Sequence, residues 1–184
     1  VYERVLAPAM KIVGQRWHEG SMSIGQEHMA TESLGSVARD MLRLIQPEHE
    51  TRQVLLACFA DEEHNLPLYG VAFRCVSWGY RPVVLGIRTP PSAIRHAVES
   101  LDPVLVGLSV TVTPPAYRAR ELLEQYADAC RDRAWAVGGS GAESLKEMVE
   151  PLGGMVVEGD LSGLKPKFDA FIARQRMRGT GSSK

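Results

Sequence analysis

This sequence has few cysteines, no excess of one charge sign and no long apolar runs. Its 184 residues include three cysteines, and none forms a Cys-x-x-Cys pair, so we expect neither a disulfide framework nor a cysteine zinc site. The 21 Lys and Arg residues balance 22 Asp and Glu residues, which excludes the basic excess typical of a nucleic-acid clamp. No apolar run approaches the roughly 20 residues of a membrane helix. We therefore expect a cytoplasmic protein in a reducing environment, with no membrane contact.

The composition is nevertheless that of a folded chain. Hydrophobic residues make up 45% and charged residues 23%, which is enough apolar material for a core and excludes disorder. The chain begins at Val1 rather than Met, without a signal peptide, so we expect a fragment trimmed at its N-terminus. The Gly- and Ser-rich residues 178–184 are expected to be a flexible tail.

Residues 1–46 show the apolar spacing of helices. One helix is predicted to end at Trp17 and His18, and a second to begin after Ser23, which can form a capping box with Gln26. Two helices alone enclose a core poorly, so we expect a partial helical bundle that upstream helices or another chain complete. The charged residues 47–51 are expected to be a linker.

From residue 52 to 177, short apolar runs alternate with helical stretches. Each run is too short for a helix and rich in Val, Leu and Ala, as a buried strand is. The pattern predicts an α/β domain with a doubly wound, five-stranded parallel sheet and helices on both faces. The expected strands are 54–59, 82–85, 104–109, 134–137 and 155–157, and the expected helices are 66–79, 92–101, 115–131, 142–152 and 161–175.

Ligands of such sheets bind beyond the carboxyl ends of the strands, and the loop after the first strand places a histidine there. Glu62 precedes His64 by two residues and can accept a hydrogen bond from the second ring nitrogen. Such a bond fixes the tautomer and raises the basicity of a metal-ligating imidazole. The alternative is a solvated loop histidine or a helix cap.

Two further edge loops suit a large, flat ligand. Ser109 and Thr111 offer hydroxyls for a buried polar group, and glycines after the fourth strand allow close approach of the backbone. Neither a Walker loop nor Gly-x-Gly-x-x-Gly occurs at the positions where a nucleotide phosphate would need them. The glycines are Gly138, Gly139 and Gly141.

Together these loops resemble the cobalamin-binding, Rossmann-like fold, whose signature is Asp-x-His-x-x-Gly, then Ser-x-Leu/Thr, then Gly-Gly. The resemblance implies that His64 is the lower axial ligand of cobalt, in place of the cofactor's own benzimidazole base. It also implies that the nucleotide tail that carries this displaced base lies beside Ser109 and the glycines. Two positions depart from the signature: Glu62 stands in place of Asp and keeps the carboxylate, and Pro67 stands in place of Gly.

The helical region sharpens the resemblance. Trp17-His18 and Glu27-His28 form the spacing Trp-x9-Glu-His, which resembles the light-responsive CarH and LitR regulators of the MerR superfamily, binders of adenosylcobalamin. The resemblance implies that Trp17 covers the upper face of the corrin and that Glu27 and His28 contact the adenosyl group. It also implies that His18 becomes the upper cobalt ligand after light removes that group. Core packing of Trp17 and helix-dipole effects at Glu27 and His18 are the alternatives.

The implied function is that of an adenosylcobalamin-binding photosensory domain in a light-dependent transcriptional repressor, which is not an enzyme. The protein would form a homo-oligomer, either a dimer or a tetramer, and light would change its oligomeric state. DNA would be bound only through a domain absent from this chain. The main alternative is a corrinoid carrier protein of a cobalamin-dependent methyltransferase system. The further alternatives are a regulator of this fold that binds haem or no cofactor, and a redox or antirepressor-type interaction module.

Overall fold

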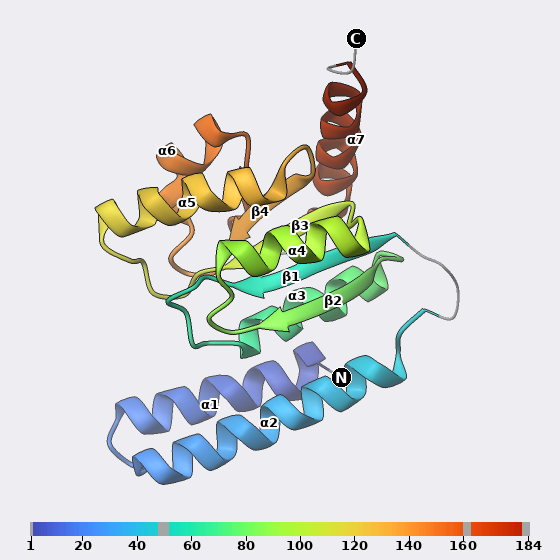
Figure 1. The fold of residues 1–184 in the computed structure, drawn as a ribbon. Helices are drawn as coiled ribbons and strands as arrows, with labels where there is room; N and C mark the ends of the chain where they lie inside the picture. The colour runs from blue at the N-terminus through green and yellow to red at the C-terminus, as the bar shows by residue number, and fades with distance from the viewer. Residues whose placement is uncertain (1, 48–51, 160–162, 182–184) are drawn as a thin grey trace.

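The computed structural model describes residues 2–47, 52–159 and 163–181, and it consists of a helix pair beside an α/β sheet (Figure 1). The pair comprises a π-helical turn, Tyr2–Leu6, followed by α1 (Ala7–His18) and α2 (Ile24–Leu44). The predicted capping box is confirmed, because the Gln26 backbone N–H donates to Ser23 Oγ at 3.3 Å and the Ser23 N–H donates to Gln26 Oε1 at 2.9 Å.

All strands of the five-stranded sheet run parallel, in the order β2-β1-β3-β4-β5. Each expected strand lies within one residue of an observed strand at both ends, so the predicted fold class is confirmed. The chain reverses its direction of winding between β1 and β3, where ligand crevices form in such sheets. The strands are β1 (Gln53–Cys58), β2 (Arg81–Gly86), β3 (Leu105–Ser109), β4 (Ala134–Gly138) and β5 (Met155–Val156).

Helices cover both faces of the sheet, as doubly wound topology requires. One core layer lies between the sheet and α4, α5 and α6, and the other lies under α3 and α7, with the helix pair beyond α3 (Figure 1). The helices are α3 (Leu66–Ser77), α4 (Pro91–Leu101), α5 (Ala116–Cys130), α6 (Lys146–Val149) and α7 (Lys165–Gly181). None of the helices in the described part of the chain is long and apolar enough to cross a membrane.

Two helix predictions differ from the structure. The helix expected over 142–152 is broken into a 3-10 turn, α6 and a second 3-10 turn, Glu150–Leu152, that contains Pro151. The last helix begins at Lys165 and continues to Gly181, so residues 178–181 of the expected flexible tail are helical. Residues 48–51 of the expected linker, 161–162 of the last expected helix and 182–184 of the tail lie outside the described residues.

The helix pair packs on α3, the helix that begins directly after the His64 loop. Ala38 and Leu42 of α2 are buried in the same core layer as Leu68 of α3. The ring of Tyr2 stacks on Phe73 of α3 with the centroids 5.1 Å apart. The buried face of α2 and the ring of Tyr2 therefore dock the helix pair on α3.

This packing gives a stability prediction on two leucines of one helix. Leu42 is 6% exposed and Leu44 is 84% exposed. Leu42→Ala removes buried apolar surface and leaves a cavity, so it should lower the free energy of unfolding by about 2–5 kcal/mol in urea denaturation. Leu44→Ala is the matched control and should change it by less than about 0.5 kcal/mol. Equal effects of the two substitutions would contradict the docking of α2 on α3.

Candidate functional site

His64 stands on the loop after β1, against a buried carboxylate. Glu62 is only 3% exposed, and its Oε1 lies 2.5 Å from Nδ1 of His64 and accepts the His64 backbone N–H at 2.9 Å. The His64 side chain is 59% exposed. Because Nδ1 donates to the carboxylate, Nε2 is the nitrogen left to bind a metal on the open side of the loop.

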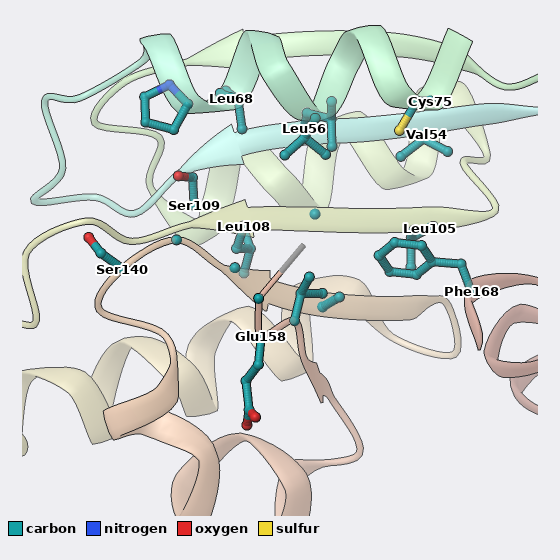
Figure 2. Close-up of a pocket in the computed structure, with 18 of the residues that line it drawn as sticks. Val54, Leu56, Leu68, Cys75, Leu105, Leu108, Ser109, Ser140, Glu158 and Phe168 are labelled. Atoms are coloured by element: carbon teal, nitrogen blue, oxygen red, sulfur yellow. The ribbon is translucent and has the colours of Figure 1, made fainter. Parts of the chain in front are cut away.

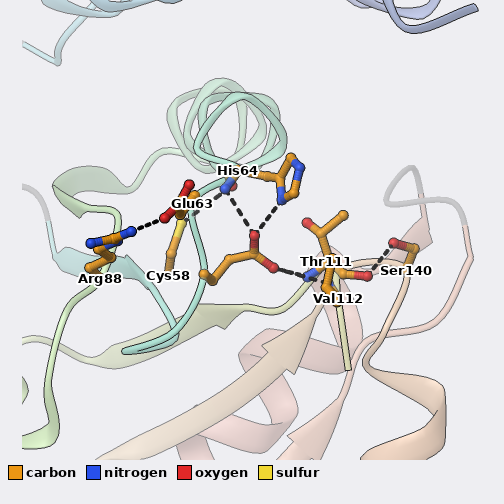
Figure 3. Close-up of polar contacts among 8 residues, drawn as sticks. Cys58, Glu63, His64, Arg88, Thr111, Val112 and Ser140 are labelled. Carbon is orange, nitrogen blue, oxygen red and sulfur yellow. Dashed lines mark hydrogen bonds and ion pairs between the residues drawn. The ribbon is translucent and has the colours of Figure 1, made fainter. Parts of the chain in front are cut away.

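The second oxygen of Glu62 faces the loop after β3. Oε2 accepts the backbone N–H groups of Thr111 and of Val112, the latter at 3.1 Å (Figure 3). Burial opposes ionisation of Glu62, but the hydrogen bonds from His64, Thr111 and Val112 outweigh it and hold the pKa of the carboxyl below its usual value. The ionised Glu62 therefore joins the two edge loops and orients the imidazole.

A cavity of about 260 Å³ lies between the helix pair and these loops, and both Glu27 and His64 line it. Glu27 of α2 accepts the Thr31 hydroxyl at 2.7 Å, and its other oxygen lies 2.6 Å from Nδ1 of His28. The Thr31 hydrogen bond is the largest cause that holds the pKa of Glu27 below its usual value. The remaining lining residues are Met10, Val13, Gly14, Thr31, Leu34, Glu63, Asn65, Leu66, Pro67 and Thr111.

All three of the other residues predicted on the helix pair lie outside this cavity. Trp17 is 51% exposed, and His18 is exposed beside it at the end of α1. The side chain of His28 is 70% exposed and contacts Glu27. The structure thus brings Glu27, His64 and Thr111 to one cavity and leaves the predicted roles of Trp17, His18 and His28 as predictions.

A second cavity, of about 420 Å³, runs along the sheet under α3 and α7. Ser109 and Ser140 lie at its end near the carboxyl edge of the sheet, and Phe168 of α7 lies at the other end (Figure 2). Between these ends its walls are mainly apolar side chains of the strands. Pro67 lines both cavities, so the two spaces adjoin at the start of α3.

Two of the three glycines at the end of β4 are required by close approach of the loop after β3. Gly138 and Gly139 line the second cavity, and Gly139 has a φ of +106°. A Cβ at Gly139 would lie 2.3 Å from the carbonyl oxygen of Val110. Gly141 is buried, and a Cβ there would lie 2.9 Å from Thr113 Oγ1. Side chains at Gly139 and Gly141 would push apart the loops after β3 and β4. At Gly138, the last residue of β4, a Cβ would make only an ordinary contact with Val157 at 3.6 Å.

Comparison with known proteins gives the family of this arrangement. Residues 1–37 match the family model described as a B12 binding domain. The chain is 33% identical over 160 residues to the HTH-type transcriptional repressor CarH of Myxococcus xanthus, an alignment that covers 86% of the chain and 53% of the repressor. The chain is a CarH-like B12-binding domain. It is also 26% identical over 153 residues to the repressor CarA of the same organism, with 83% of the chain and 51% of that protein covered.

The CarH-like domain spans about half the length of these two curated relatives. Among solved structures, it is similar to the monomethylamine corrinoid protein of Methanosarcina barkeri, with a TM-score of 0.66, 16% identity, and 90% of the chain and 80% of that protein covered. It is also similar to the methanol:cobalamin methyltransferase complex MtaBC of the same organism, with a TM-score of 0.56, 20% identity, and coverage of 93% and 66%. These likenesses show that the domain has the cobalamin-binding fold.

The residues of this CarH-like domain fit a cobalamin. No group of three or more His, Cys, Asp and Glu side chains placed to hold a metal ion occurs within residues 2–47, 52–159 and 163–181. A single imidazole, oriented by Glu62, suits a metal that brings its other ligands in a macrocycle. The long apolar cavity beside Ser109 and the glycines has the place expected for a nucleotide tail.

Sequence analysis missed several residues of the site in this CarH-like domain. Phe168 comes from a helix almost 60 residues after β3, and Val112 contributes only its backbone N–H. One signal was available for the cavity walls: alternate residues of one strand share a face, as Val54 and Leu56 do, and Leu105, Gly107 and Ser109 do. The backbone contact of Val112 has no sequence signal.

The close approach at Gly139 gives the second prediction for this CarH-like domain. Gly139→Ala combines an unfavourable φ with a clash against Val110, and it should lower the free energy of unfolding by about 3 kcal/mol or more in urea denaturation. Gly153 also has a positive φ, +80°, but nothing lies within 4 Å of its Cβ position. Gly153→Ala should therefore cost only about 1 kcal/mol. A Gly139→Ala protein as stable as Gly153→Ala would show that the loops can separate freely.

Proposed function

We propose that this domain binds adenosylcobalamin and is the photosensory part of a light-dependent transcriptional repressor. The observation that carries the proposal is the cavity lined by both His64, on the sheet side, and Glu27, on the helix side. A ligand in it contacts both halves of the domain at once, so a change in the ligand can alter how the halves pack. The similarity to the repressor CarH supports the regulatory role.

In this proposal each half of the domain has its own task. His64 binds cobalt through Nε2, and Glu62 orients the ring through its hydrogen bond with Nδ1. The apolar cavity under α3 and α7 takes the nucleotide tail, with Ser109 and Ser140 at its polar end. Glu27 and His28 contact the adenosyl group, and Trp17 covers the upper face of the corrin.

Bound adenosylcobalamin supplies a cobalt–carbon bond that visible light breaks. His18 would then be the residue of the chain that binds the cobalt in place of the lost group, and α1 and α2 would shift with it. Trp17 and His18 are exposed at the end of α1, so a movement of that end breaks few buried contacts. The helix pair is thus a two-state element whose equilibrium the ligand biases.

The readout is proposed to be assembly of the domain with copies of itself. A dimer or tetramer that forms with the intact cofactor in darkness would dissociate in light, and DNA would be bound by another domain of the whole protein. The chain would then act as a sensor and not as an enzyme.

A corrinoid carrier of a methyltransferase system is the alternative function. The likeness in fold to the monomethylamine corrinoid protein allows it, because a carrier also needs a lower histidine and a tail cavity. The two functions require cofactors with different upper ligands on cobalt. A carrier should prefer methylcobalamin and show no light-dependent change in assembly, whereas the proposed sensor should prefer adenosylcobalamin.

The role of His64 is tested by substitution with a matched histidine control. His64→Ala should weaken adenosylcobalamin binding at least about tenfold, since loss of a mere positioning partner of a ligand already costs about 10–100-fold. The absorption spectrum of the bound cofactor should change to that of a cobalamin whose lower ligand is water or the cofactor's own base. His96→Ala, on the exposed face of α4, should change neither quantity. A His64→Ala protein with the wild-type spectrum would rule out the axial role.

The light response is tested by size-exclusion chromatography of the wild-type domain with adenosylcobalamin, in darkness and after green light. We expect a larger assembly in darkness and a smaller one after light. His18→Ala should keep the dark assembly and the dark spectrum, but its light product should lack the spectrum of a cobalt with two histidine ligands. Methylcobalamin serves as the control cofactor. Identical elution in darkness and light would refute the switch, and an unchanged light product in His18→Ala would refute the capture role.

A further inference from the structure

One buried hydroxyl connects the loop that carries His64 to the neighbouring loop after β2. Tyr126, near the C-terminal end of α5, is completely buried. Its hydroxyl donates to the carbonyl oxygen of Thr89 at 2.7 Å and accepts the backbone N–H of Ala60 at 2.8 Å. Ala60 lies on the loop after β1 and Thr89 on the loop after β2, so a single side chain from α5 holds both.

The same two loops hold the backbone of Glu62. The Glu62 N–H donates to the carbonyl oxygen of Phe59, and the Arg88 N–H donates to the carbonyl oxygen of Glu62, each at 3.0 Å. The rings of Phe59 and Tyr126 pack with their centroids 5.1 Å apart. Glu62 is therefore fixed, on both sides, by residues adjacent to those that the Tyr126 hydroxyl joins.

We propose that Tyr126 is a positioning residue for the cobalt ligand: its hydroxyl fixes the loop of Glu62, and Glu62 fixes the imidazole of His64. This inference rests on the proposed role of His64 as the axial ligand. Tyr126 is not among the residues that line either of the two ligand cavities, so it acts through the loop alone.

The buried Tyr126 hydroxyl holds this loop more firmly than does the exposed ion pair that also joins the loop to α5. Arg118 donates to Asp61 at 2.9 and 3.3 Å, but the two side chains are 33% and 49% exposed, so water can replace this ion pair. Loss of the Tyr126 hydroxyl instead leaves the Ala60 N–H and the Thr89 carbonyl without that partner in a site where the hydroxyl itself is buried. The loop must then move to find new partners.

Tyr126→Phe separates positioning from packing, because it removes the hydroxyl and keeps the ring. Tyr117→Phe is the matched control, since Tyr117 lies on the same helix and is 78% exposed. With adenosylcobalamin in darkness, Tyr126→Phe should bind at least about tenfold more weakly, and its spectrum should shift towards that of His64→Ala. Tyr117→Phe should match the wild type in affinity and spectrum.

A second measurement needs no cofactor. In the cofactor-free protein, hydrogen–deuterium exchange over residues 59–66 should be at least about tenfold faster in Tyr126→Phe than in the wild type or in Tyr117→Phe. The exchange of β4 should be the same in all three proteins. Wild-type exchange over 59–66 together with a wild-type spectrum in Tyr126→Phe would overturn the inference, because the loop would then not depend on the hydroxyl.

The outcomes distinguish this inference from the proposed function. If the wild type binds no adenosylcobalamin, or if His64→Ala leaves its spectrum unchanged, the axial role fails, and the exchange experiment alone decides whether Tyr126 fixes the loop. If Tyr126→Phe does not fold, the wild type still provides the test. Its Ala60 amide should exchange as slowly as the amides of β1, and exchange as fast as that of the exposed Glu63 would overturn the inference.

Discussion

The site depends on one buried carboxylate. Glu62 accepts four hydrogen bonds, from the backbone and ring of His64 and from the backbone N–H groups of Thr111 and Val112. A buried charge is tolerated only when its oxygens are fully paired, so this arrangement forms only when the loops after β1 and β3 are both in place. The fold supplies that condition, because β1 and β3 are parallel neighbours whose carboxyl ends meet at one edge. The topology of the sheet and the orientation of the imidazole are thereby linked.

Much of this arrangement could be predicted from the sequence, because it depends on local periodicity. Short apolar runs marked the strands, and Ser23 with Gln26 marked the start of α2. Once the strands were recognised as parallel, their order along the chain was enough to bring His64 and Thr111 to the same edge. The Glu-x-His spacing also predicted the contact between Glu62 and His64, because a carboxylate two residues before a histidine in a loop can reach its Nδ1.

The remaining features depend on contacts between distant segments, which a single sequence does not record. The binding of Glu62 to backbone N–H groups about 50 residues away leaves no trace in side-chain identity. Phe168 reaches the apolar cavity only because α7 crosses the same face of the sheet as α3. The continuation of α7 to Gly181 was missed because Gly and Thr have low helix propensity, although a low propensity does not by itself end a helix. The exposure of Trp17 depends on how the helix pair is docked.

Pro67 stands at the boundary between the two cavities, in the first turn of α3. Its pyrrolidine ring fixes the backbone φ and needs no hydrogen-bond partner for nitrogen, so the corner it forms is stiff. The start of α3 thus contributes the same rigid residue to the wall of each cavity. A change of backbone at this one position would therefore alter the walls of both cavities together.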